Sequence, residues 1–491
     1  MAIEMTYGNF FLLSLFYFWA SSTSLSLGIG YYTVYRPIIA GMVTGLILKD
    51  VQTGMQAGAL INIIYIDFVS TGGSFKGDQC LTAIIAATAA ILFSLDPIEA
   101  AAIAFPFGFL GILIWKYRLK INNIFVRIYE KKYRENKFSD ICIYNGLLPQ
   151  LLLYLMSFAV IVTAFFLMFL FCNLLIYSDK VTNILYYVGM TLVVFSAFNI
   201  LFKLRNKKNF IIFASFFIVT ILFSLRAYQL FIVLLIILSF ISDYKIFAGY
   251  NNQKNRIIRK RDLVYSWFIW KNFSHSCYSY ERLMGMAFAH SMKNIFKRLY
   301  SDRDTVRKAI HSHTEFFNTE PNMGTPIHGY IISLEEERKL KNESFEEGNI
   351  SYIKKSMMGI AAGLGDSFTQ VVLTPLYISM SLMLCLDGSY YLSLLPVALL
   401  ALNIIFISYK GFMKGYYHGR DSLMERIKAV KNSKIKKYFP FMFSAILGST
   451  MGNLLYPAVV ENILTKIIII LVILLTFIVQ TKRFPGPNSN L

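Results

Sequence analysis

Long apolar stretches alternate along the chain with short polar segments, most of them basic. A helix needs about 20 predominantly apolar residues to cross a bilayer. Several stretches have that character, namely 147–175, 181–202, 210–242 and a run that ends near residue 480. The third of these is long enough for two spans broken near Arg226. The pattern predicts an all-α, polytopic membrane protein.

The pattern changes near residue 250 and divides the chain into two unlike parts. Residues 1–250 are almost wholly apolar, residues 255–355 are amphipathic and polar, and apolar spans resume over about 357–480. The segment 251–256 is polar and has no periodic hydrophobic residues, which is typical of a linker. We therefore predict one membrane domain over 1–250 and a second domain over 251–491, whose amphipathic part faces the cytoplasm.

Composition and charge agree with a membrane protein whose basic loops face the cytoplasm. Hydrophobic residues make up 56% of the chain and charged residues only 15%, against roughly 25% charged residues in soluble domains. The net charge is +20, and basic clusters lie between the apolar runs, which is the pattern of cytoplasmic loops. No basic segment belongs to a recognisable nucleic-acid-binding module, so we expect no nucleic-acid partner.

The cysteines predict neither disulfides nor a metal centre. The five cysteines are widely spaced, and most lie in or beside apolar runs. Cysteines of this kind are usually small buried hydrophobic residues. We expect no metal and no cofactor.

The first part contains one informative region, RPIIAGMVTGLILKD at 36–50 followed by GMQAGALINIIYIDFVSTGGSFKGD at 54–78. Its recurring small residues allow helices to pack closely in a membrane. The sequence therefore predicts a tightly packed hairpin over this region.

Polar residues at expected membrane depth follow in the same region. Asn62, Asp67 and Asp78 would be costly there unless they faced a partner or a polar cavity, so we expect them to bind substrate. Gly72 and Gly73 would interrupt a helix and predict a re-entrant or broken segment beside a substrate path. The alternative is that Asp67 and Asp78 lie at the level of the lipid headgroups and bind nothing specific.

In the second part, HTEFFNTEP at 313–321 combines an imidazole, carboxylates, two aromatic rings and an amide. Sugar recognition needs such a mixture, because hydroxyl groups require hydrogen-bonding partners and the sugar ring packs on flat apolar faces. His313 and Asn318 are therefore candidate substrate-binding residues. For His313 alone, an interface histidine with satisfied hydrogen bonds is the alternative.

Three consecutive glutamates follow at 335–337. They cannot all face one side of a helix, so we expect Glu335 and Glu336 to point inward with a structural or substrate-binding role. A fully solvated helix face is the alternative.

The segment MMGIAAGLGDSF at 357–368 is rich in glycine but lacks the lysine of a phosphate-binding loop, so it does not predict a nucleotide site. In a membrane, Gly363 and Gly365 suggest a tight hairpin whose backbone is covered by neighbouring helices. We expect that hairpin to hold Asp366 and Ser367 against the transport path.

These motifs resemble one known family. The Arg-Pro segment, the glycine-rich hairpin and the GG-x-x-x-x-D ending resemble the N-terminal half of mannose-family IIC proteins of the sugar phosphotransferase system. The motifs YERLMGMAFAHSM, HTEFFNTEP, ISLEEE and MMGIAAGLGDSF, in this order and spacing, resemble the IID proteins of the same family. Lys49 departs from the family pattern, which favours glycine there. The chain resembles a fused IIC and IID permease.

The resemblance implies a function. Such a permease would import a hexose of the mannose, glucose, fructose or amino-sugar class and present it to a soluble IIB component for phosphorylation. Its partners would be the sugar, the soluble IIA and IIB components, membrane lipid and further copies of itself. No phosphoryl-carrying or other catalytic residue is expected in this chain. Two alternatives are an ion-coupled sugar carrier, in which Asp67, Asp366 or the glutamate triplet relay protons, and a sugar sensor that transports nothing.

Overall fold

The computed structural model describes residues 5–22, 24, 26, 28–66, 77–137, 140–175, 178–203, 207–223, 257–341 and 347–460. Nearly all of these residues are helical, and the described part of the chain has two isolated β-bridges but no β-strand. The predicted all-α class is confirmed.

The first part of the chain contains nine α-helices among its described residues. They are α1 (Tyr7–Ser21), α2 (Pro37–Ile47), α3 (Val51–Ile64), α4 (Gln79–Leu92), α5 (Pro97–Ala104), α6 (Gly108–Arg134), α7 (Leu148–Leu175), α8 (Asp179–Lys203) and α9 (Lys207–Phe223). Short 3-10 turns cover Gly30–Tyr32 and Phe105–Phe107, and a π-helical turn at Ile143–Leu147 leads into α7.

The second part also contains nine α-helices among its described residues. They are α11 (Lys260–Phe273), α12 (Gly285–Leu299), α13 (Arg303–Ser312), α14 (Thr325–Leu340), α15 (Glu347–Gly365), α16 (Thr374–Leu386), α17 (Leu394–His418), α18 (Arg420–Lys431) and α19 (Lys434–Val460). A π-helical segment, Asp366–Leu373, joins α15 to α16.

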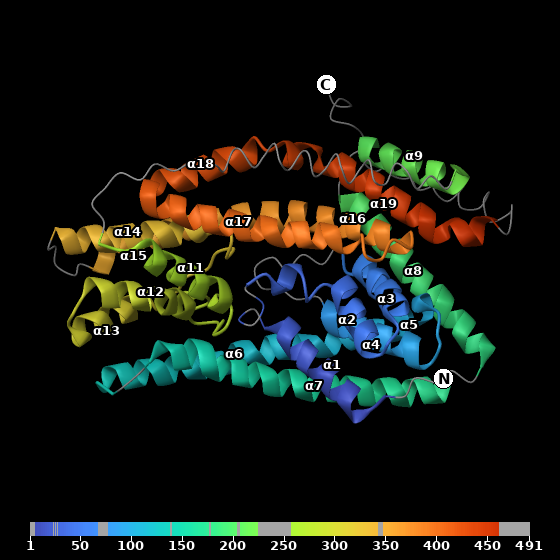
Figure 1. The fold of residues 1–491 in the computed structure, drawn as a ribbon, viewed down its shortest axis with the longest axis horizontal. Helices are drawn as coiled ribbons and strands as arrows, with labels where there is room; N and C mark the ends of the chain where they lie inside the picture. Colours follow the sequence, from blue (N-terminus) through green and yellow to red (C-terminus); the bar gives the residue numbers. More distant parts are fainter. Residues whose placement is uncertain are drawn as a thin grey trace, which may run out of the picture.

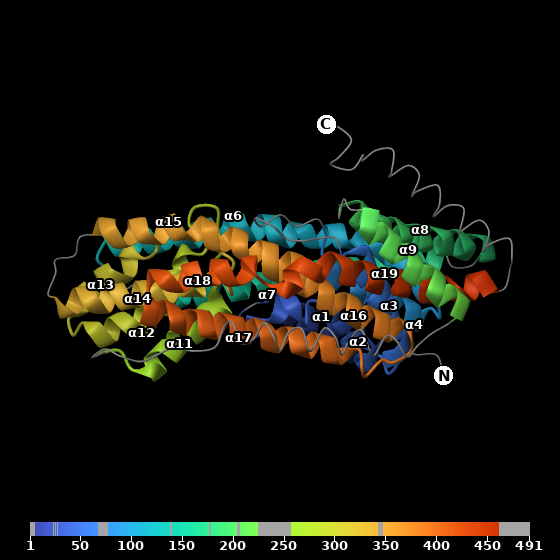
Figure 2. The same ribbon diagram turned by 90° about the horizontal axis from the view of Figure 1, so that it is seen from above.

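The molecule is elongated, and the two parts are interleaved along its length (Figures 1 and 2). In Figure 1, α17, α18 and α19 run along one long side and α6 and α7 along the other. The short helices α2 to α5 fill the space between these sides at one end, and α11 to α15 fill it at the other. Helix α9 of the first part packs along α19 of the second.

The predicted close packing of small residues is present between α2 and α3. A Cβ atom on Gly41 would lie 2.2 Å from the carbonyl oxygen of Gly54, and one on Gly58 would lie 2.4 Å from the carbonyl oxygen of Pro37. Both distances are shorter than real Cβ contacts, so these positions require glycine for the helices to approach. Asp50 begins α3 by accepting a hydrogen bond from the backbone N–H of Thr53.

The expected hairpin at Gly363 and Gly365 is wrong. Helix α15 runs through both glycines and continues into the π-helical segment, and neither glycine has a positive φ. A Cβ on Gly365 would lie 2.3 Å from the Cβ of Glu320. Gly365 therefore permits the close approach of another segment, and it does not make a turn. Gly72 and Gly73 lie outside the described residues.

Five helical segments of the described chain are long and apolar enough to cross a membrane. They are Pro97–Arg134, Ile143–Leu174, Asp179–Leu201, Ile350–Leu386 and Leu394–His418. Large apolar side chains such as Leu151 on α7 and Phe195 on α8 are exposed in the isolated chain, as expected for surfaces that face lipid. Of the predicted spans, those at 147–175 and 181–202 correspond to α7 and α8, the N-terminal half of 210–242 is α9, and residues beyond 460 lie outside the described chain.

Candidate functional site

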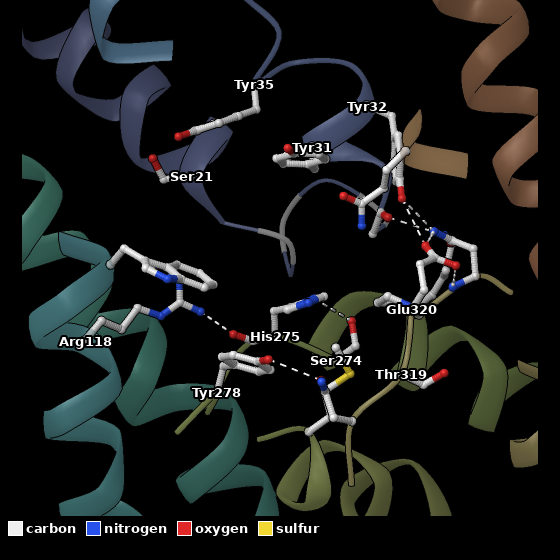
Figure 3. Close-up of a pocket in the computed structure, with 18 of the residues that line it drawn as sticks. Ser21, Tyr31, Tyr32, Tyr35, Arg118, Ser274, His275, Tyr278, Thr319 and Glu320 are labelled. Atoms are coloured by element: carbon white, nitrogen blue, oxygen red, sulfur yellow. Dashed lines mark hydrogen bonds between the residues drawn. The ribbon is translucent and has the colours of Figure 1, made fainter. Parts of the chain in front are cut away.

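A cavity of about 180 Å³ lies at the junction of the two parts (Figure 3). We call it the junction cavity. This volume is more than ten times the roughly 10–15 Å³ that one water molecule requires, so the junction cavity can hold a small organic molecule. Its walls come from the end of α1, the turn before α2, α6 and α7 of the first part, and from α11, two loops and the π-helical segment of the second.

Aromatic rings form two walls of the junction cavity. Tyr31, Tyr32 and Tyr35 belong to the turn before α2, where the rings of Tyr31 and Tyr35 are stacked with centroids 5.9 Å apart. Across the junction, Trp115 of α6 stacks on Tyr278 with centroids 5.8 Å apart. Figure 3 shows Tyr31 and Tyr35 on one side of the site and Tyr278 and His275 on the other. Flat apolar faces of this kind suit the ring of a sugar.

Glu320 is a buried carboxylate on the cavity wall. Its Oε2 accepts hydrogen bonds from the backbone N–H groups of Asn322 (3.0 Å) and Met323 (2.6 Å), which hold the loop before α14 in a tight turn. Its Oε1 accepts a hydrogen bond of 3.0 Å from the hydroxyl of Tyr32. Because Tyr32 belongs to the first part and Glu320 to the second, this contact joins the two parts at the site (Figure 3).

Two buried cations hold the same loop in place. Lys271 donates to the side-chain oxygen of Asn322 and, at 3.3 Å, to the carbonyl oxygen of Gly28. Burial lowers the pKa of Lys271 to about 8, although the charge of Glu320 opposes that shift. Arg426 of α18 donates to the carbonyl oxygens of Asn322 and Met323 from outside the cavity lining. The loop that presents Glu320 is therefore fixed from both sides.

Asn318, Asp366 and Gln370 add further polar groups to the lining. Asn318 Oδ1 accepts a hydrogen bond of 3.2 Å from the hydroxyl of Tyr278. Asp366 is half-buried and begins the π-helical segment, where its Oδ1 accepts a hydrogen bond of 3.0 Å from Gln370 Nε2. Within the described residues, no lysine, arginine or histidine forms an ion pair with Asp366. Its second carboxylate oxygen is available to a ligand.

Asp78 reaches the junction cavity from the first part. Its Oδ1 accepts a hydrogen bond of 2.9 Å from the backbone N–H of Leu81 and so begins α4. Its Oδ2 accepts a hydrogen bond of 2.7 Å from the hydroxyl of Tyr17. Asp78 thus has a structural role as a helix cap and also lines the cavity.

His275 and Arg118 form the floor of the cavity beside Tyr278 (Figure 3). The Arg118 guanidinium donates to the carbonyl oxygens of His275 and Ser276, so α6 of the first part holds the loop after α11. Burial and the positive charges of Arg118 and Lys271 lower the pKa of His275 to about 4. His275 is therefore neutral at pH 7.

The structure places the sequence-predicted residues in different environments. Asp78, Asn318 and Asp366 line the junction cavity. Asn62 lines a smaller pocket beside it. Ser367 donates to the carbonyl oxygen of Leu364 and is absent from both linings. Asp67 lies outside the described residues.

His313, Glu335 and Glu336 lie elsewhere, in a closed cluster inside the second part that we call the His313 cluster. Nε2 of His313 lies 2.9 Å from Oε1 of Glu335, whose Oε2 accepts from Arg338. Buried Lys354 donates to the backbone carbonyl oxygen of His313. Burial lowers the pKa of His313 despite the neighbouring Glu335 carboxylate.

Glu336 belongs to the same cluster and is fully buried. It accepts hydrogen bonds from the backbone N–H groups of Ile257 (2.6 Å) and Ile258 (2.8 Å) and from the hydroxyl of Tyr416 (2.5 Å). It therefore attaches the start of the second part to α14 and α17.

Several lining residues were not singled out from the sequence. The aromatic residues and Glu320 are the main examples, although Glu320 lies within the motif HTEFFNTEP that pointed to sugar binding. The tyrosines of the first part are clustered in the sequence GYYTVYRP just before the informative hairpin, which is a signal that could have been used. Among the described residues, no group of three or more His, Cys, Asp or Glu side chains is placed to bind a metal ion.

The fold and the cavity define a multi-pass helical membrane protein with a polar, aromatic site between two unlike halves. Two family models match the chain. Residues 8–240 match the family described as PTS system sorbose-specific IIC component, and residues 257–483 match PTS system mannose/fructose/sorbose family IID component. The chain belongs to the mannose/fructose/sorbose family of phosphotransferase permeases and carries the IIC and IID components fused in one multi-pass protein of the bacterial cell membrane.

Individual relatives match one component each. The mannose-specific EIID component of Escherichia coli K12 is 33% identical over 155 residues, which are 31% of this chain and 54% of that protein. The sorbose-specific EIIC component of Klebsiella pneumoniae is 29% identical over 110 residues, 22% of this chain and 41% of that protein. The chain thus spans about half the length of the curated relatives it matches. The cryo-EM structure of the mannose transporter ManYZ with microcin E492 aligns with 42% of this chain and 72% of its own chain at 26% identity, with a TM-score of 0.32.

Proposed function

We propose that this chain is the sugar-translocating permease of a phosphoenolpyruvate-dependent phosphotransferase system, and that a hexose binds in the junction cavity. The curated relatives carry mannose, sorbose or fructose in their names. The sugar would belong to the mannose, glucose, fructose or amino-sugar class, and a soluble IIB partner would phosphorylate it.

The lining of the junction cavity is the observation that carries this proposal. Stacked rings such as Trp115 and Tyr278 stand across from the tyrosines of the first part. Asp366 and Asn318 supply acceptors, and a carboxylate is a strong acceptor for sugar hydroxyl groups. Because the lining comes from both halves, a bound sugar would contact the IIC-like and IID-like parts together.

The basic helix ends support one orientation of the molecule. The last turns of α6, α12 and α14 all carry lysine or arginine, and they lie at the end of the molecule that contains α13 (Figure 1). By the positive-inside rule this end faces the cytoplasm, where a soluble IIB partner would be. The amphipathic part at about 255–355 would then lie on the cytoplasmic side, and the division at about residue 250 would separate the two domains.

Uptake into right-side-out vesicles tests the proposal. Vesicles that carry this chain are loaded with or without phosphoenolpyruvate and the soluble phosphotransferase components, and radiolabelled mannose, glucose or N-acetylglucosamine is added. We expect sugar phosphate to accumulate only with the complete donor system. Accumulation without the donor would indicate an ion-coupled carrier, and sugar binding without uptake would indicate a sensor.

A further inference from the structure

A second, much smaller pocket lies beside the junction cavity. Its volume is about 10 Å³, close to the minimum for one water-sized group. It is lined by Tyr31, Arg36, Asn62, Ile66, Gln370, Thr374, Pro375 and Ile378. Tyr31 and Gln370 also line the junction cavity, so the two spaces share a wall.

Four polar atoms around this pocket lack hydrogen-bond partners among the described residues. Asn62 is completely buried, yet both its Oδ1 and its Nδ2 are without a hydrogen bond. The same is true of Nε of buried Arg36 and of Oε1 of Gln370. A buried polar group without a partner is energetically unfavourable, so a pocket that keeps several of them is built for a polar occupant.

The mixture of donors and acceptors identifies the kind of occupant. Asn62 Nδ2 and Arg36 Nε are donors, whereas Asn62 Oδ1 and Gln370 Oε1 are acceptors. The guanidinium of Arg36 disfavours a cation in the pocket, and the two carbonyl oxygens disfavour an anion. A neutral group that both donates and accepts satisfies all of them, and the volume admits a single hydroxyl group or one water molecule.

The pocket also joins the two halves of the chain. Arg36 precedes α2 and Asn62 lies on α3 of the first part, whereas Gln370 lies in the π-helical segment of the second. Nε2 of Gln370 donates to Asp366 in the junction cavity at 3.0 Å. Gln370 therefore contacts both spaces, and an occupant of the small pocket would be connected to a ligand of the junction cavity.

We propose that the pocket formed by Arg36, Asn62 and Gln370 is a second subsite, which takes one hydroxyl group of the transported sugar. The inference rests on the proposed function, since it assumes that a sugar binds in the junction cavity. The subsite selects sugars by the hydroxyl at one ring position, because a sugar without that hydroxyl leaves the buried groups unpaired. A water molecule has the same hydrogen-bonding chemistry and is the competing occupant.

Binding of deoxy sugars to the purified full-length protein distinguishes the two occupants. Affinities are measured for the hexose that the wild type binds best and for its analogues that each lack one hydroxyl. In the wild type we expect one analogue to bind about tenfold more weakly or worse because of the unpaired groups. In Asn62→Leu that penalty should disappear to within about twofold of the parent sugar, while the other analogues keep their wild-type penalties. Gln370→Leu changes a pocket residue in the second part of the chain, and it should abolish the penalty at the same ring position.

Asn209→Leu is the matched control. Asn209 on α9 is also buried, and both its amide atoms lack a partner in the part of the chain that the structure describes. It lines neither cavity, so the pattern of penalties should match the wild type. If every penalty also stays at its wild-type value in Asn62→Leu and Gln370→Leu, the pocket holds water and the proposal is wrong. If Asn62→Leu does not fold, Asn62→Ser and Gln370→Leu provide the same comparison. A wild type that binds no hexose at all would instead refute the proposed function.

Discussion

One stretch of sequence contributes residues to both the junction cavity and the His313 cluster, although the two regions are opposite environments. The motif HTEFFNTEP starts with His313, which points into a closed network with Glu335, and its second-last residue is Glu320, which lines the cavity between the two halves. In the cluster, buried charges are matched by neighbouring groups of the protein. In the cavity, Asp366 keeps a carboxylate oxygen available and aromatic faces remain uncovered.

This difference separates residues that maintain the fold from residues that can bind a ligand. A buried charge that is already paired and hydrogen-bonded has no capacity left for substrate, and its removal leaves its partners unpaired. A half-buried polar group on a cavity wall has few protein partners, so its removal changes binding more than stability. Substitutions in the His313 cluster should therefore change stability, whereas substitutions in the junction cavity should change binding.

The largest effect is expected for Glu336→Ala. The change leaves two backbone N–H groups and the hydroxyl of Tyr416 without their acceptor, which should lower the free energy of unfolding by on the order of 3 kcal/mol or more. Thermal unfolding of the purified protein in detergent measures it. Glu337→Ala is the control, because that side chain is 53% exposed and forms a surface ion pair with Lys341. Equal midpoints for the two variants would contradict a structural role for Glu336.

Asp366→Asn should show the opposite behaviour. The wild-type carboxylate accepts one described hydrogen bond, from Gln370, and lies in the cavity wall. Loss of a charge-assisted hydrogen bond to the sugar should weaken binding by roughly tenfold or more, with little change in the unfolding midpoint. Titration of the purified protein with the preferred hexose measures the affinity. The control is Asp421→Asn, which changes an exposed carboxylate in the first turn of α18. An unchanged affinity would remove Asp366 from the binding site.

Acid should destabilise the second part through His328. Burial lowers the pKa of this histidine to about 3, from about 6.5 in the unfolded chain. The folded state therefore binds fewer protons between these values, and stability that is complete above pH 6.5 falls as the pH is lowered. We expect His328 alone to contribute a loss of about 1 kcal/mol between pH 6.5 and 5.5.

Unfolding midpoints of the wild type and His328→Gln over this pH range test whether His328 causes the acid sensitivity. The variant should be less stable at pH 7.5 because His328 packs between aromatic rings and near Ser291. Its midpoint should nevertheless fall less steeply on acidification than that of the wild type. Parallel curves would show that another group causes the acid sensitivity.

The smallest effect is expected for Trp115→Leu. This change removes the ring that stacks on Tyr278 and one flat face of the cavity, and an aromatic contact contributes about 1 kcal/mol beyond its buried area. Hexose affinity should fall about fivefold. Phe109→Leu on the same helix is the control, since Phe109 is exposed and does not line the cavity. A similar loss in both variants would mean that α6 has shifted and that stacking is not the cause.

Local features of the chain account for what could be predicted. Helical class, membrane location and the two unlike parts follow from the length and spacing of apolar runs, because each span depends only on its own residues. The pairing of α2 with α3 follows from small residues that are close in sequence. The motif HTEFFNTEP contains Asn318 and Glu320, which both line the junction cavity, but only Asn318 is a candidate from the sequence alone.

The prediction failed at Gly363 and Gly365 for a reason that lies in another segment. Two glycines close together suggest a turn, but these two continue a helix, and Gly365 makes room for Glu320. Which segment packs against a glycine cannot be read from the glycine's neighbours in the chain. The same limit applies to His313 and Asn318, which are five positions apart and face different environments.

The sequence by itself determined that this protein is a helical, multi-pass membrane protein built from a IIC-like and a IID-like part. These properties depend on the hydrophobicity of single segments and on motifs contained within them. The tertiary structure decided which polar side chains line a cavity and which neutralise one another. The outcome depends on contacts such as the hydrogen bond from Tyr32 to Glu320, which joins residues from opposite halves. These partners are far apart in the chain, and no local sequence pattern specifies which distant side chain a residue will contact.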